Sequence, residues 1–226
     1  MSVGISFIRA AFITLWIAFL VVSLCSRSVA AGRAELPSAA EDISPLGVGD
    51  RAPAFTVRTV DDEPYYFDPD NLDRPTVLIS FRGGWCPYCN MHLSELRHVV
   101  PDLKESGFDV LFLSNDRPDQ LYEGLQRETQ EDIDGLDYLI LSDAGINAAR
   151  ALGTAFTISG GLIDYLENKE RDYDESSIAR HRALAVPSVF IVDRSGKIVF
   201  AYANPDYKVR LSATELKEAA DRVLAQ

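Results

Sequence analysis

Short apolar runs alternate with segments of helical periodicity from about residue 47 to the C-terminus. The clearest β-type runs are Thr76–Phe81, Asp109–Ser114 and Val189–Val192. They are apolar along nearly their whole length, which is typical of strands buried on both faces of a sheet. We therefore predict a sheet whose inner strands lie between layers of helices.

The residues after the first run have the spacing of a helix. Leu93, Leu96, Val100 and Leu103 fall on one face, and Gly107 is a typical stop signal. We predict one helix that runs to about Ser106.

Weaker patterns predict the remaining elements. These are strands near residues 55–60, 65–67, 138–141 and 198–202, and helices opening near residues 116, 142, 162 and 212. The region 154–182 is less regular. Strand and helix alternate and the chain ends in a hairpin and a helix, so we expect an α/β sandwich in which helices flank a central mixed β-sheet.

The N-terminus has the form of a secretory signal peptide. Arg9 precedes an apolar stretch, Ala10–Leu24, and small residues follow up to Ala30. We predict a signal peptide over residues 1–30, a tether over 31–46 and one domain over 47–226. The chain would then be exported to the periplasm or secreted. The alternative is a retained leader that anchors the chain in a membrane.

The charge of the chain limits its partners. Its 226 residues carry a formal net charge of −12, and the leader contains two arginines and no acid. A chain this acidic does not attract nucleic acid or anionic lipid through bulk charge. We expect no nucleic-acid partner.

Two of the three cysteines, Cys86 and Cys89, lie three residues apart where the first strong strand gives way to its helix; the third, Cys25, lies in the leader. Such spacing at this place is typical of a redox pair. Helix N-termini stabilise anions, and cysteines placed there titrate at roughly 3.5–7.5 rather than about 8.5. We therefore expect the pKa of Cys86 to be low.

The helical periodicity suggests different roles for the two sulfurs. We predict that Cys86, at the open tip, is the exposed attacking thiol, and that Cys89, one turn further in, is its shielded resolving partner. A zinc half-site and a pair of inert core thiols are the alternatives. Zinc would need two more ligands, and His92, expected on the helix surface, is the only candidate nearby.

Several strings carry a resemblance to a known family. They are Gly49–Phe55, Phe81–Cys89 (Phe-Arg-Gly-Gly-Trp-Cys-Pro-Tyr-Cys), Val186–Asp193, Gly196–Ile198 and Asn204–Tyr207 followed by Arg210. On these residues the chain resembles the thioredoxin superfamily, and within it the peroxiredoxin-like branch with an alkyl hydroperoxide reductase/thiol-specific antioxidant domain. The resemblance covers about residues 47–226 and implies a thioredoxin-like fold.

The resemblance also implies roles for residues around the motif. In thioredoxin-like folds a proline at the place of Pro187 is cis and faces the disulfide, which would leave the backbone of Val186 free to pair with a partner. Independently of the resemblance, we expect Trp85 to shield the disulfide, with simple packing as the alternative. Arg82 would stabilise the leaving alkoxide of a peroxide, or would form only a surface salt bridge.

The chain departs from the peroxiredoxin pattern at the reactive loop. Peroxiredoxins carry Pro-x-x-x-Thr-x-x-Cys there, but counting back from Cys86 places Gly83 at the threonine position and Ile79 at the proline position. The family therefore favours peroxidase chemistry, whereas the residues themselves favour dithiol–disulfide exchange.

These observations lead to one main hypothesis and two alternatives. The main one is a thiol peroxidase that reduces hydroperoxides through a Cys86/Cys89 cycle and is regenerated by a thioredoxin-like protein. The first alternative is an exported thiol–disulfide oxidoreductase acting on protein disulfides. The second is a copper-binding thiol module. We expect no cofactor and no metal, and a membrane contact only if the leader is retained.

Overall fold

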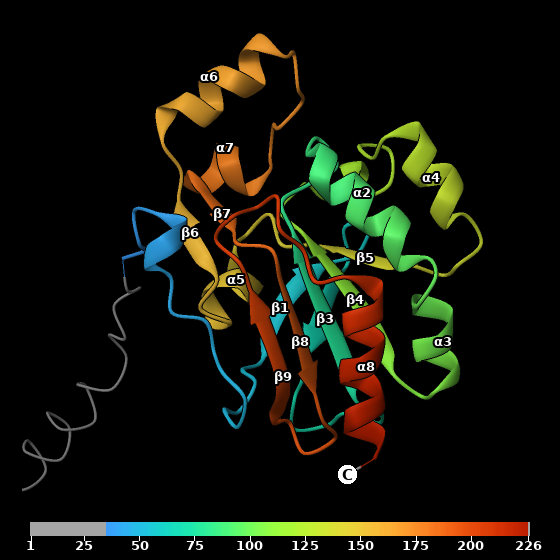
Figure 1. The fold of residues 1–226 in the computed structure, drawn as a ribbon. Coiled ribbons are helices and arrows are strands. Elements are labelled where there is room, and N and C mark those ends of the chain that lie inside the picture. The colour runs from blue at the N-terminus through green and yellow to red at the C-terminus, as the bar shows by residue number, and fades with distance from the viewer. Residues whose placement is uncertain (1–34, 226) are drawn as a thin grey trace, which may run out of the picture. The chain divides into compact units, whose positions relative to one another are not determined.

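A seven-stranded mixed sheet forms the centre of the computed structural model, which describes residues 35–225 (Figure 1). The strand order is β2-β1-β5-β4-β3-β8-β9. Their bounds are β1 Phe55–Arg58, β2 Pro64–Phe67, β3 Thr76–Phe81, β4 Asp109–Ser114, β5 Leu139–Ser142, β8 Ser188–Val192 and β9 Ile198–Ala203. Strands β3, β4 and β5 are parallel, and the other pairings are antiparallel. The expected fold class is confirmed.

Helices cover both faces of this sheet (Figure 1). The α-helices are α2 Pro87–Leu96, α3 Val100–Glu105, α4 Arg127–Ile133, α5 Asn147–Ala151, α6 Gly160–Asn168, α7 Ser177–His181 and α8 Ala213–Leu224; short 3-10 turns lie at Ala40–Asp42 (η1) and Pro118–Gln120 (η2). Helices α2, α3, α4 and α8 share one hydrophobic core, and α5 belongs to a second core.

The alternation of side chains in β3 separates these two cores. Val77, Ile79 and Phe81 point into the core under α2, whereas Leu78 points into the core with α5. Successive side chains of a strand face opposite ways, so an unbroken apolar run serves both cores at once. This burial of both faces fixes the register of β3, and so the position at which the chain leaves the sheet for the cysteines.

The long helix predicted after the motif is two helices. Residues Arg97–Val99 separate α2 from α3, and the N–H groups of His98 and Val99 donate to carbonyls only three residues back. Pro101 is the physical reason, because in a continuous helix it could not donate to the carbonyl of Arg97 and its ring would clash with that carbonyl. The apolar periodicity continues across the break, which is why it suggested one helix.

The irregular region holds three elements that the sequence pattern did not predict. Strands β6 (Ala155–Thr157) and β7 (Ala183–Ala185) pair antiparallel as a small second sheet, and α7 precedes β7. Strands of three residues, mostly alanine in β7, have too little β propensity to stand out.

Residues 36–46, expected to be a tether, pack against the domain. The backbone N–H of Thr157 donates to the carbonyl of Pro37 at 2.8 Å, and the N–H of Leu46 donates to the carbonyl of Leu152 at 3.1 Å. The packed unit therefore starts at Leu36 rather than at residue 47. Alanine, serine and proline favoured a linker by composition, but their backbone groups found partners.

The predicted leader, residues 1–30, and Cys25 within it lie outside the described residues. Among residues 35–225, every helix is too short or too polar to cross a bilayer.

A glycine pair tests the packing of the N-terminal segment. Gly153 and Gly135 have nearly the same positive φ, +73° and +72°, but an added Cβ would lie 2.2 Å from the carbonyl oxygen of Ser44 at Gly153 and would meet nothing within 4 Å at Gly135. Both alanine variants should lose about 1–2 kcal/mol from backbone strain. Gly153→Ala should lose about 1–3 kcal/mol more from the clash.

Urea unfolding of the two variants measures the difference, and limited proteolysis reports release of residues 36–46. Equal losses in both variants would show that the segment does not pack on Gly153.

Candidate active site

The site begins where β3 ends. The chain leaves the sheet at Phe81, crosses Arg82–Trp85 and enters α2 with Cys86 as N-cap and Pro87 as first helical residue. Cys86 has the extended backbone of an N-cap, at φ −91° and ψ 115°. Proline suits the first helical position because its missing N–H would have had no partner there. The sequence-based position of the motif at a strand–helix junction is correct.

Two glycines allow the segment Arg82–Trp85 to lie close to neighbouring loops. A Cβ on Gly83, which has φ +141°, would lie 2.4 Å from a carboxylate oxygen of Asp116. A Cβ on Gly84 would lie 2.3 Å from the carbonyl oxygen of Gly124. Gly83 holds the place of the peroxiredoxin threonine, and a side chain there would meet the Asp116 carboxylate.

Buried polar side chains fix the position of the segment Arg82–Trp85. The Asn90 amide donates to the carbonyls of Gly84, at 2.7 Å, and Cys86, at 3.0 Å, and accepts from the N–H of Gln126 at 2.8 Å. An Asp116 carboxylate oxygen accepts from the N–H of Gly84 at 2.7 Å. The loops after β3 and β4 are thus tied together at the carboxyl ends of two parallel strands.

Both motif cysteines are free thiols with 0% exposure. The prediction that Cys86 is exposed is therefore wrong. Trp85 is 92% buried in the same core cluster, so the N-terminus of α2 is covered rather than open. The expected difference in burial between the two sulfurs is absent.

The two thiols share one negative charge. Burial alone would raise the pKa of Cys89, but the hydrogen bond from the Cys86 thiol, the positive charge of Arg210 and the N–H of Arg82 bring it down to about 6. The pKa of Cys86 is raised, because its proton is held in that hydrogen bond and because the site is buried and already negative. The raised pKa of Cys86 differs from the low value that we expected, and the single negative charge belongs to the hydrogen-bonded pair.

Two arginines provide the positive charge of the site. The Arg210 guanidinium donates to the sulfur of Cys89 at 3.5 Å. Arg82 is 93% buried, and its guanidinium carbon lies 5.1 Å from the ring centre of Trp85 and 4.5 Å from that of Tyr207. Arg82 is therefore part of the thiol environment and not of a surface salt bridge.

Pro187 lies at the start of β8 and lines a cavity with Arg82. The structure has no cis peptide bond among residues 35–225, so the expected cis bond before Pro187 is contradicted. The Val186 N–H donates to the carbonyl of Thr154 at 2.9 Å, so it is not free for an incoming partner. Thr154, the residue before β6, supplies the contact that the resemblance did not include.

Several residues of the site have no clear signal in the sequence. The sequence points to Arg210 and Tyr207 only through the family resemblance. Asp116 could have been found from its place after β4, since the carboxyl ends of β3 and β4 meet. Burial raises its pKa to about 7, with a contribution from the negative charge of Cys89.

His92, expected on the helix surface, is 95% buried. Its Nε2 lies 2.9 Å from the carbonyl oxygen of Leu211, and burial lowers its pKa to about 4. The neutral ring donates to this carbonyl and ties α2 to the segment that carries Arg210.

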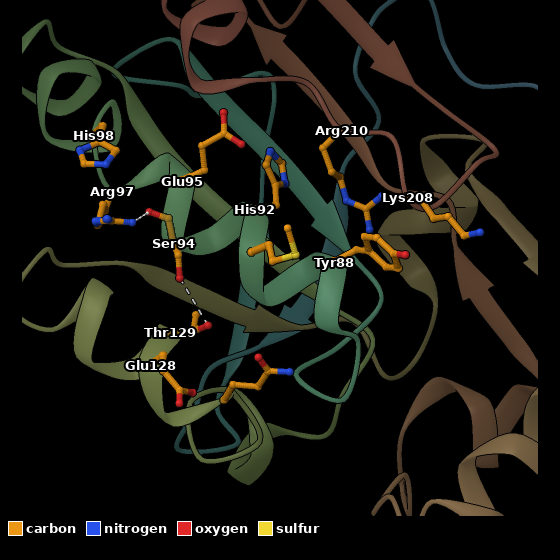
Figure 2. A pocket seen from close by; sticks show the side chains of 12 residues that line it. Tyr88, His92, Ser94, Glu95, Arg97, His98, Glu128, Thr129, Lys208 and Arg210 are labelled. Atoms are coloured by element: carbon orange, nitrogen blue, oxygen red, sulfur yellow. Dashed lines mark hydrogen bonds between the residues drawn. The ribbon is translucent and has the colours of Figure 1, made fainter.

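Arg210 reaches a groove of about 710 Å³ along α2 (Figure 2). Tyr88 and His92 line it from the helix, and Lys208 and Arg210 line it from the segment after β9. Within residues 35–225, no group of three or more His, Cys, Asp or Glu side chains is placed to hold a metal ion.

Two buried aspartates offer a matched test of these electrostatics. Asp116 and Asp143 both have a pKa raised to about 7 by burial, but only Asp116 is coupled to Cys89. Removing the negative charge of Cys89 favours the carboxylate of Asp116, so Cys89→Ser should lower the pKa of Asp116 below about 7 and leave that of Asp143 unchanged. Carboxyl NMR titration measures both aspartates, and an unchanged pKa of Asp116 would contradict the coupling.

Comparison with known proteins shows the family and the fold of this chain. The family model described as "AhpC/TSA family" matches residues 48–201. A relative, peroxiredoxin Bcp of Escherichia coli, is 29% identical over 101 residues, covering 45% of this chain and 60% of that protein.

Solved structures share the fold at low sequence identity. A reduced peroxiredoxin of Vibrio vulnificus in complex with hydrogen peroxide aligns with a TM-score of 0.59 at 16% identity, covering 77% of this chain and 99% of that one. A peroxiredoxin-like protein of Aquifex aeolicus aligns with a TM-score of 0.55 at 18% identity, covering 80% and 89%. The motif at the start of α2, the fold around it and the family match together show that this chain belongs to the AhpC/TSA family, the peroxiredoxin-like branch of the thioredoxin superfamily.

Proposed function

We propose that the chain is a thiol peroxidase that reduces hydroperoxides through a Cys86/Cys89 dithiol–disulfide cycle, which a thioredoxin-type donor protein resets. The observation that carries the proposal is a buried thiol pair that holds one negative charge beside Arg82 and Arg210. Only a thiolate attacks a peroxide, and this pair is ionised at neutral pH. The family match supports the same chemistry.

The hydrogen bond between the two sulfurs activates Cys86. Cys86 passes its proton to the Cys89 thiolate and attacks the terminal oxygen of the hydroperoxide as a thiolate. The O–O bond breaks, Cys86 becomes a sulfenic acid, and an alkoxide leaves. Arg82 stabilises the alkoxide's charge, and Cys89 returns the proton to it, giving an alcohol.

Disulfide formation completes the oxidative half of the cycle. The Cys89 thiolate attacks the sulfenic sulfur of Cys86 and expels hydroxide. Residues three apart on a helix have Cβ atoms roughly 5–6 Å apart, against about 3.5–4.5 Å in a disulfide, so a small adjustment of the first turn closes the bond. A dithiol donor then reduces the disulfide through a mixed disulfide.

Exchange with protein disulfides as substrates is the weaker hypothesis, because the family match supports peroxide chemistry. Both cycles need a protein partner to reach sulfurs that have 0% exposure, so access is a requirement common to the two hypotheses. We further propose that the 1–30 leader exports the chain; a cleaved N-terminus in the mature protein would support this.

Hydroperoxide consumption by the purified chain tests the proposal. With a thioredoxin donor, Cys86→Ser should abolish turnover, whereas Cys89→Ser should consume one equivalent and stop as a sulfenic acid, more slowly than the wild type because the thiolate that takes the proton of Cys86 is gone. The wild-type rate should rise as the pH increases through about 6, because the pair ionises there. A rate no faster than that of a free thiol would refute the peroxidase function.

The hydrogen bond between the sulfurs has its own test. Cys86→Ala removes the donor that helps to lower the pKa of Cys89, so that pKa should rise above about 6. Cys86→Ser keeps a hydroxyl donor and should raise the pKa of Cys89 less. Absorbance at 240 nm measures the pKa of Cys89 in both variants. Identical values would show that the hydrogen bond between the sulfurs does not lower this pKa.

A further inference from the structure

Arg82 is a buried cation that shares a single thiolate with Arg210. It is 93% buried, its Nε has no hydrogen-bond partner, and none of the carboxylate ion pairs among residues 35–225 includes it. Its guanidinium lies over the faces of Trp85 and Tyr207. Two cations facing one thiolate leave one positive charge unbalanced, so the site favours a ligand that brings a second anion.

A cavity of about 260 Å³ opens against this cation. Phe156, Ile158 and Leu162 line it from β6, α6 and the segment between them, and Val186 and Pro187 line it from the start of β8. Apolar walls around a buried guanidinium match a ligand with an apolar body and an anionic end. The exposed Glu41 of η1 also lines the cavity and disfavours anions.

The charge of the site depends on its redox state. In the reduced pair, the Cys89 thiolate faces two guanidiniums, those of Arg82 and Arg210. A disulfide carries no charge, so oxidation removes the thiolate and leaves both cations. Arg210, like Arg82, belongs to no ion pair among the described residues. The oxidised site therefore attracts an anion more strongly than the reduced site.

We propose that this cavity binds a small organic carboxylate, with the carboxylate on Arg82 and the apolar chain against Phe156, Ile158 and Leu162, and that the disulfide form binds it more tightly than the dithiol form. The redox dependence rests on the Cys86/Cys89 cycle proposed above; the carboxylate site itself does not. By linkage, a carboxylate that prefers the oxidised form also makes the disulfide harder to reduce.

Calorimetry with hexanoate and its neutral analogue hexanamide tests the site. The full-length chain, set to the dithiol or disulfide form with reduced or oxidised dithiothreitol, should bind hexanoate at least about tenfold more tightly than hexanamide, since a hydrogen bond to a charged group contributes about 1.5–3 kcal/mol. The disulfide form should bind hexanoate more tightly than the dithiol form. Arg82→Gln should abolish the preference for hexanoate.

The controls separate the site from general effects. Arg127, 86% exposed on α4, is a matched arginine, and Arg127→Gln should not change binding. Leu162→Trp should fill the cavity and weaken hexanoate binding, which keeps the test decisive if Arg82→Gln does not fold. Glu41→Gln removes a negative charge from the cavity wall and should tighten hexanoate binding.

Equal affinity for hexanoate and hexanamide would overturn the carboxylate site, and equal hexanoate affinity of the two redox forms would overturn its redox dependence. The Cys86→Ser/Cys89→Ser chain, which has no redox cycle, should still prefer hexanoate. Hexanoate preference in a wild-type chain that lacks peroxidase activity would refute the proposed function alone; turnover of hydroperoxide without that preference would refute this inference alone.

Discussion

One negative charge, shared between two buried thiols and balanced by two arginines, is the interaction on which the rest of the site depends. Burial alone would keep both thiols protonated. The hydrogen bond from Cys86 and the guanidinium of Arg210 overcome that penalty at Cys89, and no comparable stabilisation remains for a second charge. The pair is therefore a singly charged unit, and its chemistry belongs to both sulfurs together.

The groups that carry and balance this charge come from different segments of the fold. Arg82 follows β3, the cysteines open α2, and Arg210 lies between β9 and α8. The hydrogen bond of His92 to the Leu211 carbonyl ties the last of these segments to the helix. Because the apolar run of β3 is buried on both faces, its register is fixed, and with it the position at which Arg82, the cysteines and Arg210 come together. The charge balance is thus a product of tertiary structure rather than of the motif alone.

The sequence predicted what local pattern controls. The strands Thr76–Phe81 and Asp109–Ser114 have the predicted bounds, and the motif lies at the predicted junction. It could not predict burial at the helix tip, because Cys86 is covered by segments distant in the chain. The packing of residues 36–46 likewise depends on contacts with segments distant in the chain, whereas composition alone favoured a tether. The cis bond expected before Pro187 came from the family resemblance, and this chain has a trans bond there.

Titration of the thiol pair tests the central claim most directly. In a chain carrying Cys25→Ser, only Cys86 and Cys89 contribute thiolate absorbance at 240 nm. The account predicts that one thiolate per chain forms in a step near pH 6 and that the second does not form at or below the pKa of an ordinary cysteine, about 8.5. Two thiolates that both form near pH 8.5 would show that the pair shares no stabilised charge, and would contradict the account.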